Sequence, residues 1–221
     1  AEPGAICSVK IDPDNRLHYE TIGGLPPKGI CGSGILDLIA EGFLSGWIDS
    51  AGNLQKGASA CIRDVWEDES QRNVPAIIYA YSGNVPLYFT QDDIGEFLTC
   101  KAAAHTMVAT LLESANVRPD EIGTFYLAGG FGTHYNLESA ITVGLYPDMP
   151  REKFKILGNS SLAGARHLLL DGQCLHRLAR IRALATYVQF GEMEKFVENM
   201  HAARFLPHTD ASLYPSVHRR V

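Results

Sequence analysis

The stretch that most constrains this chain is a short apolar run that breaks into glycines, Tyr126-Leu127-Ala128-Gly129-Gly130-Phe131-Gly132. Residues 124–127 are β-branched, aromatic or aliphatic, a composition typical of a short buried strand. Glycine lacks a Cβ atom, so such a backbone can take positive φ and can lie directly against a flat or charged ligand. The motif alone leaves two interpretations open, a ligand-binding loop and a tight turn into the next helix.

A second strand, loop and helix follows this one. Residues 154–157 favour a strand, Gly158-Asn159-Ser160-Ser161 favours a loop, and residues 162–170 favour a helix. Parallel strands need helical crossovers, and ligands of such layers bind at the carboxyl ends of the strands. The sequence therefore predicts an α/β fold with a mixed or parallel sheet flanked by helices. Two hairpins, at residues 5–22 and 76–89, are expected beside it.

A third glycine-rich loop lies near the amino-terminal end. Gly29-Ile30-Cys31-Gly32-Ser33-Gly34 leads into apolar residues at helical spacing from Ile35 onward. The start of a helix offers free backbone N–H groups and the positive end of its dipole, which suits a phosphate. Ser33 would add a hydroxyl donor there, or would only cap the helix. Asp37 would face a nucleotide-bound magnesium ion, or would only complement the dipole.

The longest predicted helix begins at a capping box. Thr90 is followed three residues later by Asp93, and an apolar stripe then continues to about Asn116. Lys101 lies on that stripe. A lysine is seldom buried without an anionic partner, so Lys101 is expected either to snorkel to the helix edge or to meet a carboxylate, ribose or phosphate.

The remaining segments carry weaker signals. The run Glu67-Asp68-Glu69 is expected to be a solvated loop. Asn136 is expected to cap a helix over residues 137–142 that ends near Gly144. Two further helices are predicted over residues 173–187 and 192–203.

Composition limits the class of protein. The chain has 221 residues, of which 46% are hydrophobic and 20% charged, so it can bury a core and is expected to be soluble and globular. A net charge of −6 argues against a nucleic-acid surface, although His218-Arg219-Arg220 could form a local basic patch. The chain contains no apolar run of about 18 residues, so no membrane span is predicted. Ala1 is not a methionine, and the start is expected to be a processed or cut end.

Cysteine and histidine usage bears on metals and on location. The cysteines are widely spaced, without a C-x-x-C pair, and the histidines show no metal-binding pairing. No metal site made by the chain's own side chains is therefore predicted. The scattered cysteines favour reduced thiols in a cytoplasm. The five are Cys7, Cys31, Cys61, Cys100 and Cys174.

The order of these motifs resembles the reductive activators of corrinoid-dependent enzymes, within the sugar kinase, heat-shock-protein and actin superfamily. The likeness extends over nearly the whole chain. The matching motifs are Pro3-Gly4-Ala5-Ile6, Lys28-Gly29-Ile30-Cys31-Gly32-Ser33-Gly34-Ile35-Leu36-Asp37, Tyr126-Leu127-Ala128-Gly129-Gly130-Phe131-Gly132, Gly158-Asn159-Ser160-Ser161-Leu162-Ala163-Gly164-Ala165 and Phe205-Leu206-Pro207-His208-Thr209-Asp210.

The resemblance implies ribonuclease-H-like lobes that close on ATP and Mg²⁺, with a [2Fe-2S] domain outside this chain. In that family, ATP binding and hydrolysis accompany electron transfer to an inactive Co(II) corrinoid and restore Co(I). The implied partner is a corrinoid protein of a methyltransferase or demethylase system, and the implied assembly is a homodimer. Residues 1–221 would be the carboxyl-terminal portion of an actin-like ATPase domain. Residues 1–89 would form its β-rich, phosphate-side segment, and residues 90–221 its α/β nucleotide-binding lobe and helical tail.

The resemblance also implies which residues bind the cofactor. Gly129 and Gly130 match the adenosine-binding loop, and the turn at residues 32–34 lies where the phosphates are expected. The full predicted set is Gly32, Ser33, Gly34, Lys101, Gly129, Gly130, Phe131, Gly132, Asn159 and Ser160.

The chain departs from the superfamily in two respects. It contains neither an Asp-x-Gly-Thr-type phosphate loop nor the cluster cysteines, so no catalytic residue is assigned, and these groups are expected upstream. ATPase activity is expected of the full-length protein, and this chain alone is expected to lack the catalytic carboxylates. Two other readings remain: another ATPase or kinase of the superfamily, and a non-catalytic module for dimerisation or for docking to a corrinoid protein.

Overall fold

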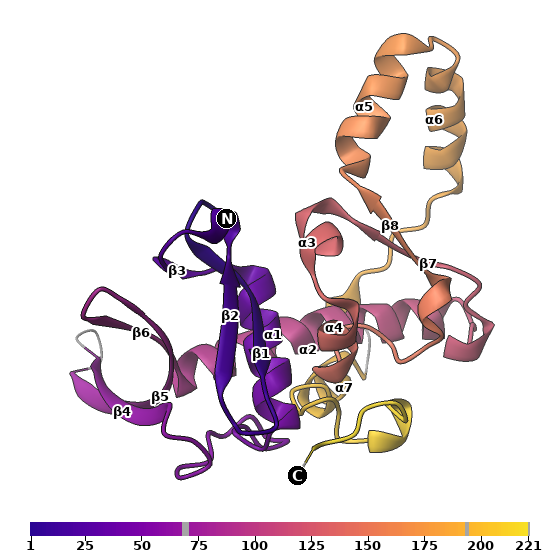
Figure 1. The fold of residues 1–221 in the computed structure, drawn as a ribbon. Coiled ribbons are helices and arrows are strands. Elements are labelled where there is room, and N and C mark those ends of the chain that lie inside the picture. The colour runs from indigo at the N-terminus through magenta and orange to yellow at the C-terminus, as the bar shows by residue number, and fades with distance from the viewer. Residues whose placement is uncertain (68–70, 193–194, 221) are drawn as a thin grey trace.

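The computed structural model describes residues 1–67, 71–192 and 195–220 of the chain (Figure 1). The strands are β1 (Ala5–Ile11), β2 (Leu17–Thr21), β3 (Gly29–Ile30), β4 (Ile62–Glu67), β5 (Arg72–Ser82), β6 (Val85–Thr90), β7 (Phe125–Ala128) and β8 (Phe154–Gly158). The α-helices are α1 (Gly32–Leu44), α2 (Gln91–Ser114), α3 (Gly129–His134), α4 (Leu137–Thr142), α5 (Ser160–Leu170), α6 (Cys174–Leu184) and α7 (Phe196–Ala202).

The strands form three small sheets. In the first, β1 pairs antiparallel with β2 and parallel with β3. In the second, β5 lies between β4 and β6, and both pairings are antiparallel. In the third, β7 and β8 are parallel. The predicted mixed sheet structure flanked by helices is therefore confirmed, as are both hairpins. Strand β4 was not predicted, and Glu67 ends it; residues 68 and 69 of the expected acidic loop lie outside the described part of the chain.

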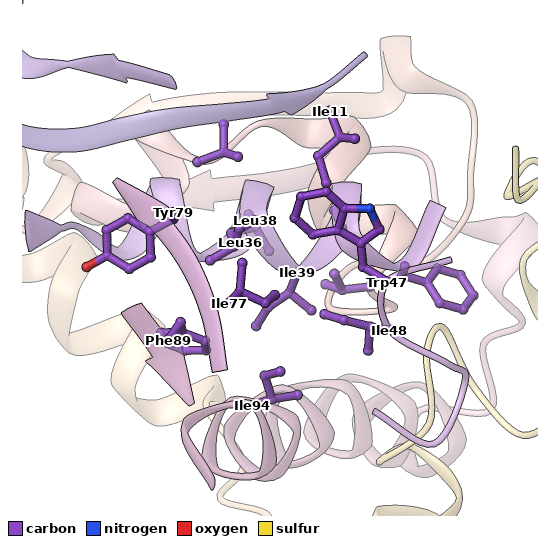
Figure 2. Packing of buried hydrophobic residues seen from close by; sticks show 14 of the residues in the cluster. Ile11, Leu36, Leu38, Ile39, Trp47, Ile48, Ile77, Tyr79, Phe89 and Ile94 are labelled. Carbon is purple, nitrogen blue, oxygen red and sulfur yellow. The ribbon is translucent and has the colours of Figure 1, made fainter. Parts of the chain in front are cut away.

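The hydrophobic core lies between the first two sheets, α1 and α2 (Figure 2). Ile39 of α1, Ile77 of β5 and Ile94 of α2 are fully buried and approach one another there. Trp47 closes one end of this cluster, and its indole nitrogen donates a hydrogen bond to the Asn15 side chain. The same cluster includes residues from both expected segments, 1–89 and 90–221, so these segments share one hydrophobic core.

The long helix begins as predicted. Thr90 accepts a hydrogen bond from the Asp93 backbone N–H at 3.1 Å, and the Asp93 carboxylate accepts one from the Thr90 backbone N–H at 2.8 Å. This reciprocal pair is the capping box expected from the sequence. Asn136 likewise caps α4, and Gly144 follows that helix with a φ of 77°. Both helix starts were thus predictable from local sequence.

Lys101 of α2 is buried, with 2% of its surface exposed. Its ammonium donates hydrogen bonds to the carbonyl oxygens of Ala203, Phe205 and Pro207, at 2.5, 2.6 and 2.6 Å. An ammonium has three donors, and all three are used here. Lys101 therefore neither snorkels nor is free to contact a ribose or phosphate, and both sequence expectations for it are wrong.

The carbonyls bound by Lys101 belong to the segment that follows α7. Gly144 packs against the same segment so closely that an added Cβ would lie 2.1 Å from the Pro207 carbonyl oxygen. Burial lowers the pKa of Lys101 to about 7, because the ammonium has lost its water. The three carbonyl oxygens replace that hydration. We call Lys101 with these three carbonyls the lysine clamp.

Beside the lysine clamp, His105 of α2 contacts the carboxyl-terminal tail. Its Nδ1 lies 3.0 Å from the Tyr214 hydroxyl, which also donates to the Gly144 carbonyl at 3.2 Å. The His105 ring lies 5.1 Å, centroid to centroid, from the His208 ring. Burial, the charge of Lys101 and the proximity of His208 lower the pKa of His105 to about 4. His105 is thus a neutral packing residue near pH 7.

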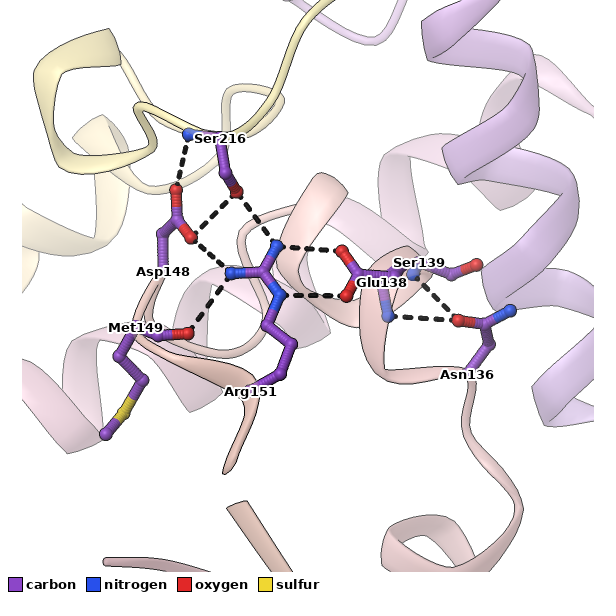
Figure 3. Close-up of polar contacts among 7 residues, drawn as sticks. All are labelled: Asn136, Glu138, Ser139, Asp148, Met149, Arg151 and Ser216. Atoms are coloured by element: carbon purple, nitrogen blue, oxygen red, sulfur yellow. Dashed lines mark hydrogen bonds and ion pairs between the residues drawn. The ribbon is translucent and has the colours of Figure 1, made fainter. Parts of the chain in front are cut away.

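Arg151 fastens the tail to the region around α4 (Figure 3). Its guanidinium pairs with both carboxylate oxygens of Glu138, at 2.8 and 2.7 Å, and with Asp148 at 2.7 Å. Asp148 in turn accepts hydrogen bonds from the backbone N–H and hydroxyl of Ser216, each at 2.8 Å. Bidentate pairs of this kind hold a defined geometry. They fix the tail along one side of the molecule.

Arg219 and Arg220 of the tail contact α1. Arg220 pairs with Glu41 at 2.8 and 3.1 Å and donates to the Ile11 carbonyl at 3.0 Å. Arg219 lies over the Phe43 ring, 5.3 Å from its centroid. Both arginines thus stabilise the carboxyl-terminal end of a helix, where cations are favoured. Both arginines have partners within the chain, so this stretch presents less free positive charge than a local basic patch would.

Replacing Lys101 with methionine should lower the free energy of unfolding by about 3 kcal/mol, because three buried carbonyls lose their donor. Urea denaturation followed by circular dichroism measures this change. Lys10 is exposed on β1, and Lys10→Met is the matched control, expected to change stability by no more than about 0.5 kcal/mol. Equal stability of the two variants would contradict the lysine clamp.

Folding lowers the pKa of His105 from 6.5 to about 4. The unfolded chain therefore binds a proton that the folded chain does not bind in this pH window. The contribution to stability is present above pH 6.5 and is lost as the pH falls toward 4, by about 3 kcal/mol.

His105→Asn, which offers Tyr214 a non-titrating partner, should flatten the stability curve between pH 6.5 and 4. Urea midpoints at half-unit pH steps measure the slope. His176→Asn, at an exposed position of α6, is the control and should leave the slope as it is in the parent chain. An unchanged slope in His105→Asn would show that another group controls acid sensitivity.

Candidate functional site

The structure brings two of the three glycine-rich loops together. Strands β7 and β8 are parallel neighbours, and their register pairs Ala128 with Gly158 at the carboxyl ends. The loop at Gly129 and the loop at Asn159 therefore leave the sheet side by side, each leading into a helix. This is the edge at which α/β layers bind ligands. We call these two loops the paired glycine loops.

The backbone of the paired glycine loops is open. Gly129 has a φ of 79° and Gly158 a φ of 65°, in the left-handed region that favours glycine. A Cβ added at Gly129, Gly130 or Gly158 would meet no other atom within 4 Å. The absence of side chains leaves space above the main chain. Positive φ occurs at Gly129 and not at Gly130.

Gly132 has a different role from the glycines before it. A Cβ at Gly132 would lie 2.9 Å from the Leu127 carbonyl carbon, so this glycine allows α3 to fold back against β7. Thr133 supports the same turn, since its hydroxyl donates to the Gly129 carbonyl at 2.8 Å. The backbone of Phe131 lies in α3, and its side chain is outside the described part of the structure.

The second loop places the start of α5 beside the first. Asn159 is the N-cap, and its side chain accepts a hydrogen bond from the Leu162 backbone N–H at 3.0 Å. Ser160 is the first residue of the helix and is exposed. A helix start presents N–H donors and the positive end of the dipole, a favourable environment for an anionic group. The Asn159 side chain itself is used for capping.

The loop at residues 32–34 packs against β1. A Cβ at Gly34 would lie 2.5 Å from the Ile6 carbonyl oxygen, so Gly34 lets α1 approach β1 closely. Ser33 is buried, and its hydroxyl donates to the Cys7 carbonyl at 2.8 Å. The N-cap of α1 is Cys31, without a side-chain cap bond, so both expectations for Ser33 are corrected. Gly32, the first residue of α1, is partly exposed.

Asp37 is also used within the chain. Its carboxylate accepts hydrogen bonds from the Ser139 hydroxyl at 2.7 Å and from the Val9 backbone N–H at 3.3 Å. Only 4% of its surface is exposed, and burial raises the pKa of its carboxyl group despite those bonds. Asp37 thus joins β1, α1 and α4, which is neither of the roles expected from the sequence. Among the described residues, no group of three His, Cys, Asp or Glu could hold a metal ion.

An apolar pocket lies apart from the paired glycine loops. It has a volume of about 370 Å³ and lies between the second half of α2 and the tail, lined by residues that include His105, Leu112, Leu145 and Tyr214. None of the ten predicted cofactor-binding residues lines it. Within the described part of the chain, no helix has the length and apolarity needed to cross a bilayer.

Gly34→Ala should lower the free energy of unfolding by about 2 kcal/mol, because its methyl group would overlap the Ile6 carbonyl and the Ile30 side chain. Gly29→Ala is the matched control on the adjoining strand, where an added Cβ meets no atom within 4 Å. Thermal denaturation of both variants decides the matter. A melting temperature for Gly34→Ala equal to that of Gly29→Ala would contradict the close contact.

Comparison with known proteins supports this architecture. The chain is 36% identical to a solved structure described as "Reductive activator for corrinoid,iron-sulfur protein", with a TM-score of 0.88 over 98% of this chain and 35% of that chain. It is 29% identical over 203 residues to the "Corrinoid activation enzyme RamQ" of Eubacterium limosum, which covers 88% of this chain and 34% of that protein. The chain thus spans about a third of the length of each relative.

A family model described as the "C-terminal domain of RACo the ASKHA domain" matches residues 1–218. The fold is accordingly the ASKHA, or actin-like ATPase, fold that the sequence predicted. Because the match extends over nearly the whole chain, this chain belongs to the family of RACo carboxyl-terminal ASKHA domains.

Proposed function

We propose that this chain is the nucleotide-binding, carboxyl-terminal part of an ATP-dependent reductive activator of a corrinoid protein. The family match supports an ASKHA domain, and the printed descriptions of both relatives concern corrinoid activation. Nucleotide binding, the restoration of Co(I) and the corrinoid partner are proposals for this chain. Its homodimeric state and cytoplasmic location stay predictions.

The observation that carries the proposal is the pairing of the two glycine loops. Gly129 and Gly158 are 29 residues apart in the sequence, and the β7–β8 register places them at one edge of the sheet. Both have positive φ and open space where side chains would otherwise lie. A flat base or ribose can rest on such a main chain with no side chain to displace.

The predicted cofactor-binding residues have different roles in this proposal. The backbone at Gly129 and Gly130 supports the adenosine portion of the nucleotide. The start of α5 at Ser160, held by the Asn159 cap, directs N–H donors and the helix dipole toward the anionic portion. Gly132 keeps α3 against β7 and so fixes the first loop. Lys101, Ser33 and Gly34 act in folding, since their polar groups or contacts are used within the chain.

The described residues fit a nucleotide better than they fit a metal. Asp37 is bonded within the chain, and the described part contains no group of three His, Cys, Asp or Glu that could hold a metal ion. We expect the carboxylates that hold Mg²⁺, the groups that activate water and an iron–sulfur cluster in other parts of the longer protein. When present, ATP with Mg²⁺ would supply the free energy of hydrolysis, and the cluster would supply the electron that converts Co(II) to Co(I).

Two experiments separate this proposal from the alternatives. Equilibrium dialysis with ATP and ADP distinguishes a nucleotide-binding domain from a module that only mediates dimerisation or docking. Capture of a purified corrinoid protein on the immobilised full-length protein distinguishes an activator from another ATPase or kinase of the superfamily. Nucleotide binding without corrinoid-protein capture would favour the second class.

Gly130→Val should weaken ATP binding by about tenfold or more, because its branched side chain would fill the space above the first loop. The free chain should tolerate the change, since an added Cβ at Gly130 meets nothing within 4 Å. Calorimetric titration of ATP into the full-length protein measures the effect.

Gly95→Val is the matched control, because Gly95 is also a helical glycine with open space, and it lies in α2. Gly95→Val therefore controls for the general effect of replacing a helical glycine with valine. ATP affinity of Gly130→Val equal to that of Gly95→Val, with both proteins folded, would remove the first loop from the nucleotide site.

A further inference from the structure

Two cysteines lie beside each other where β1 and β3 are parallel, because Cys7 is in β1 and Cys31 directly follows β3. The register of β1 and β3 pairs Ile6 with Ile30, so Cys7 and Cys31 are the next residues along the two chains. The Cys31 backbone N–H donates to the Ile6 carbonyl at 3.0 Å, so the contact between the two segments continues to Cys31. Neighbouring strands lie roughly 4.8 Å apart, within the Cα separation of about 4.4–6.8 Å that a disulfide spans.

Ser33 links the two cysteines through its hydroxyl group. The hydroxyl donates to the Cys7 carbonyl at 2.8 Å, and its oxygen lies 3.3 Å from the Cys31 sulfur. Both cysteines are partly exposed, so a small oxidant can reach them. The Cys7 thiol lies 3.5 Å from the Glu20 carbonyl oxygen of β2. Cys7 and Cys31 are thus adjacent through the backbone and share Ser33 as a hydrogen-bond partner.

The two thiols differ in their surroundings. Burial opposes ionisation of Cys31, but the Ser33 hydroxyl and the N–H groups of Gly34 and Ser33 outweigh it and lower the pKa of Cys31. Burial and the neighbouring Cys31 raise the pKa of Cys7. A thiolate at the start of a helix is the nucleophilic form of cysteine. Because of this difference, Cys31 is the thiol suited to attack an oxidant, and Cys7 is the thiol that would then react with the oxidised Cys31.

We propose that Cys7 and Cys31 form a thiol switch, in which Cys31 reacts with a hydroperoxide and Cys7 resolves the product as an intramolecular disulfide. In the first step the Cys31 sulfur attacks one peroxide oxygen, the S–O bond forms and the O–O bond breaks. The sulfur is oxidised to a sulfenic acid, and the peroxide is reduced to water or an alcohol. In the second step the Cys7 sulfur attacks the Cys31 sulfur, and hydroxide leaves with the Cys7 proton as water.

The disulfide would connect β1 to the first turn of α1. Gly34 already holds this turn against Ile6, so the two backbones are in place before the bond forms. Reduction by a dithiol would restore both thiols and release the bond. The proposed switch lies at β1 and the start of α1 and does not depend on the proposed function.

Mass spectrometry of the full-length protein tests the switch. The protein is treated with one equivalent of hydrogen peroxide at pH 7, alkylated with iodoacetamide and digested with trypsin. Cleavage after Lys10 and Lys28 separates the two cysteines into the peptide that ends at Lys10 and the peptide of residues 29–56. The expected product is these two peptides joined, with the loss of two hydrogen atoms, and it should disappear on treatment with dithiothreitol.

Serine variants of Cys7 and Cys31 test which thiol reacts first and which forms the disulfide. Cys7→Ser should stop the reaction at the Cys31 sulfenic acid, which dimedone traps, and Cys31→Ser should leave Cys7 unoxidised. Cys100 is exposed on α2 and is the control for accessibility. Cys31 should be alkylated several-fold faster than Cys100 at pH 7, because the Ser33 hydroxyl and the N–H groups at the start of α1 lower the pKa of Cys31. Circular dichroism confirms that each variant is folded.

The proposal is overturned if the joined peptides do not form, or if Cys7→Ser leaves no trapped Cys31. It is also overturned if Cys100, the more exposed thiol, is oxidised and alkylated before Cys31. In that case accessibility alone would govern reactivity, and the neighbouring thiols would be reduced packing residues.

Discussion

The lysine clamp is the interaction on which the rest of this structure depends. A buried ammonium with three carbonyl partners joins the middle of α2 to a segment about a hundred residues later, a separation of 102 to 106 positions. Leaving such carbonyls unpaired in the interior costs more than an ordinary hydrogen bond contributes. The segment it holds leads directly into the tail, so the later contacts of His105, Arg151 and Glu41 all form on a chain whose direction the clamp has set.

This anchoring explains why the two sides of the molecule are built differently. The side held by the tail is tied by buried or partly buried polar groups with fixed partners, and its core is apolar and shared between distant segments. The paired glycine loops lie at the end of a two-stranded sheet where most side chains are exposed, as at Tyr126 and Ile156. A site made of main chain needs a rigid support elsewhere, because open glycines contribute little packing of their own.

Local features of the sequence predicted local structure well. The Thr90 capping box, the Asn136 cap and both hairpins depend on residues within a few positions of one another, and they appear where expected. The roles of Lys101, Ser33 and Asp37 could not be found in this way, because each is decided by a partner that is 26 to 106 residues distant. A buried lysine on an apolar stripe did signal an unusual partner. Only the fold could show that the partner was backbone.

The glycines show that a sequence motif alone does not determine the role of a residue. Gly34, Gly129 and Gly132 all belong to glycine-rich loops that precede or open a helix, and the sequence gives no means of separating them. In the structure Gly34 and Gly132 permit close contact between a helix and a strand, while Gly129 provides positive φ beside open space. Two of the three therefore serve packing, and only an open glycine can serve a ligand. The register of β7 and β8, which sets two open loops at one edge, is what turns a weak motif into a candidate site.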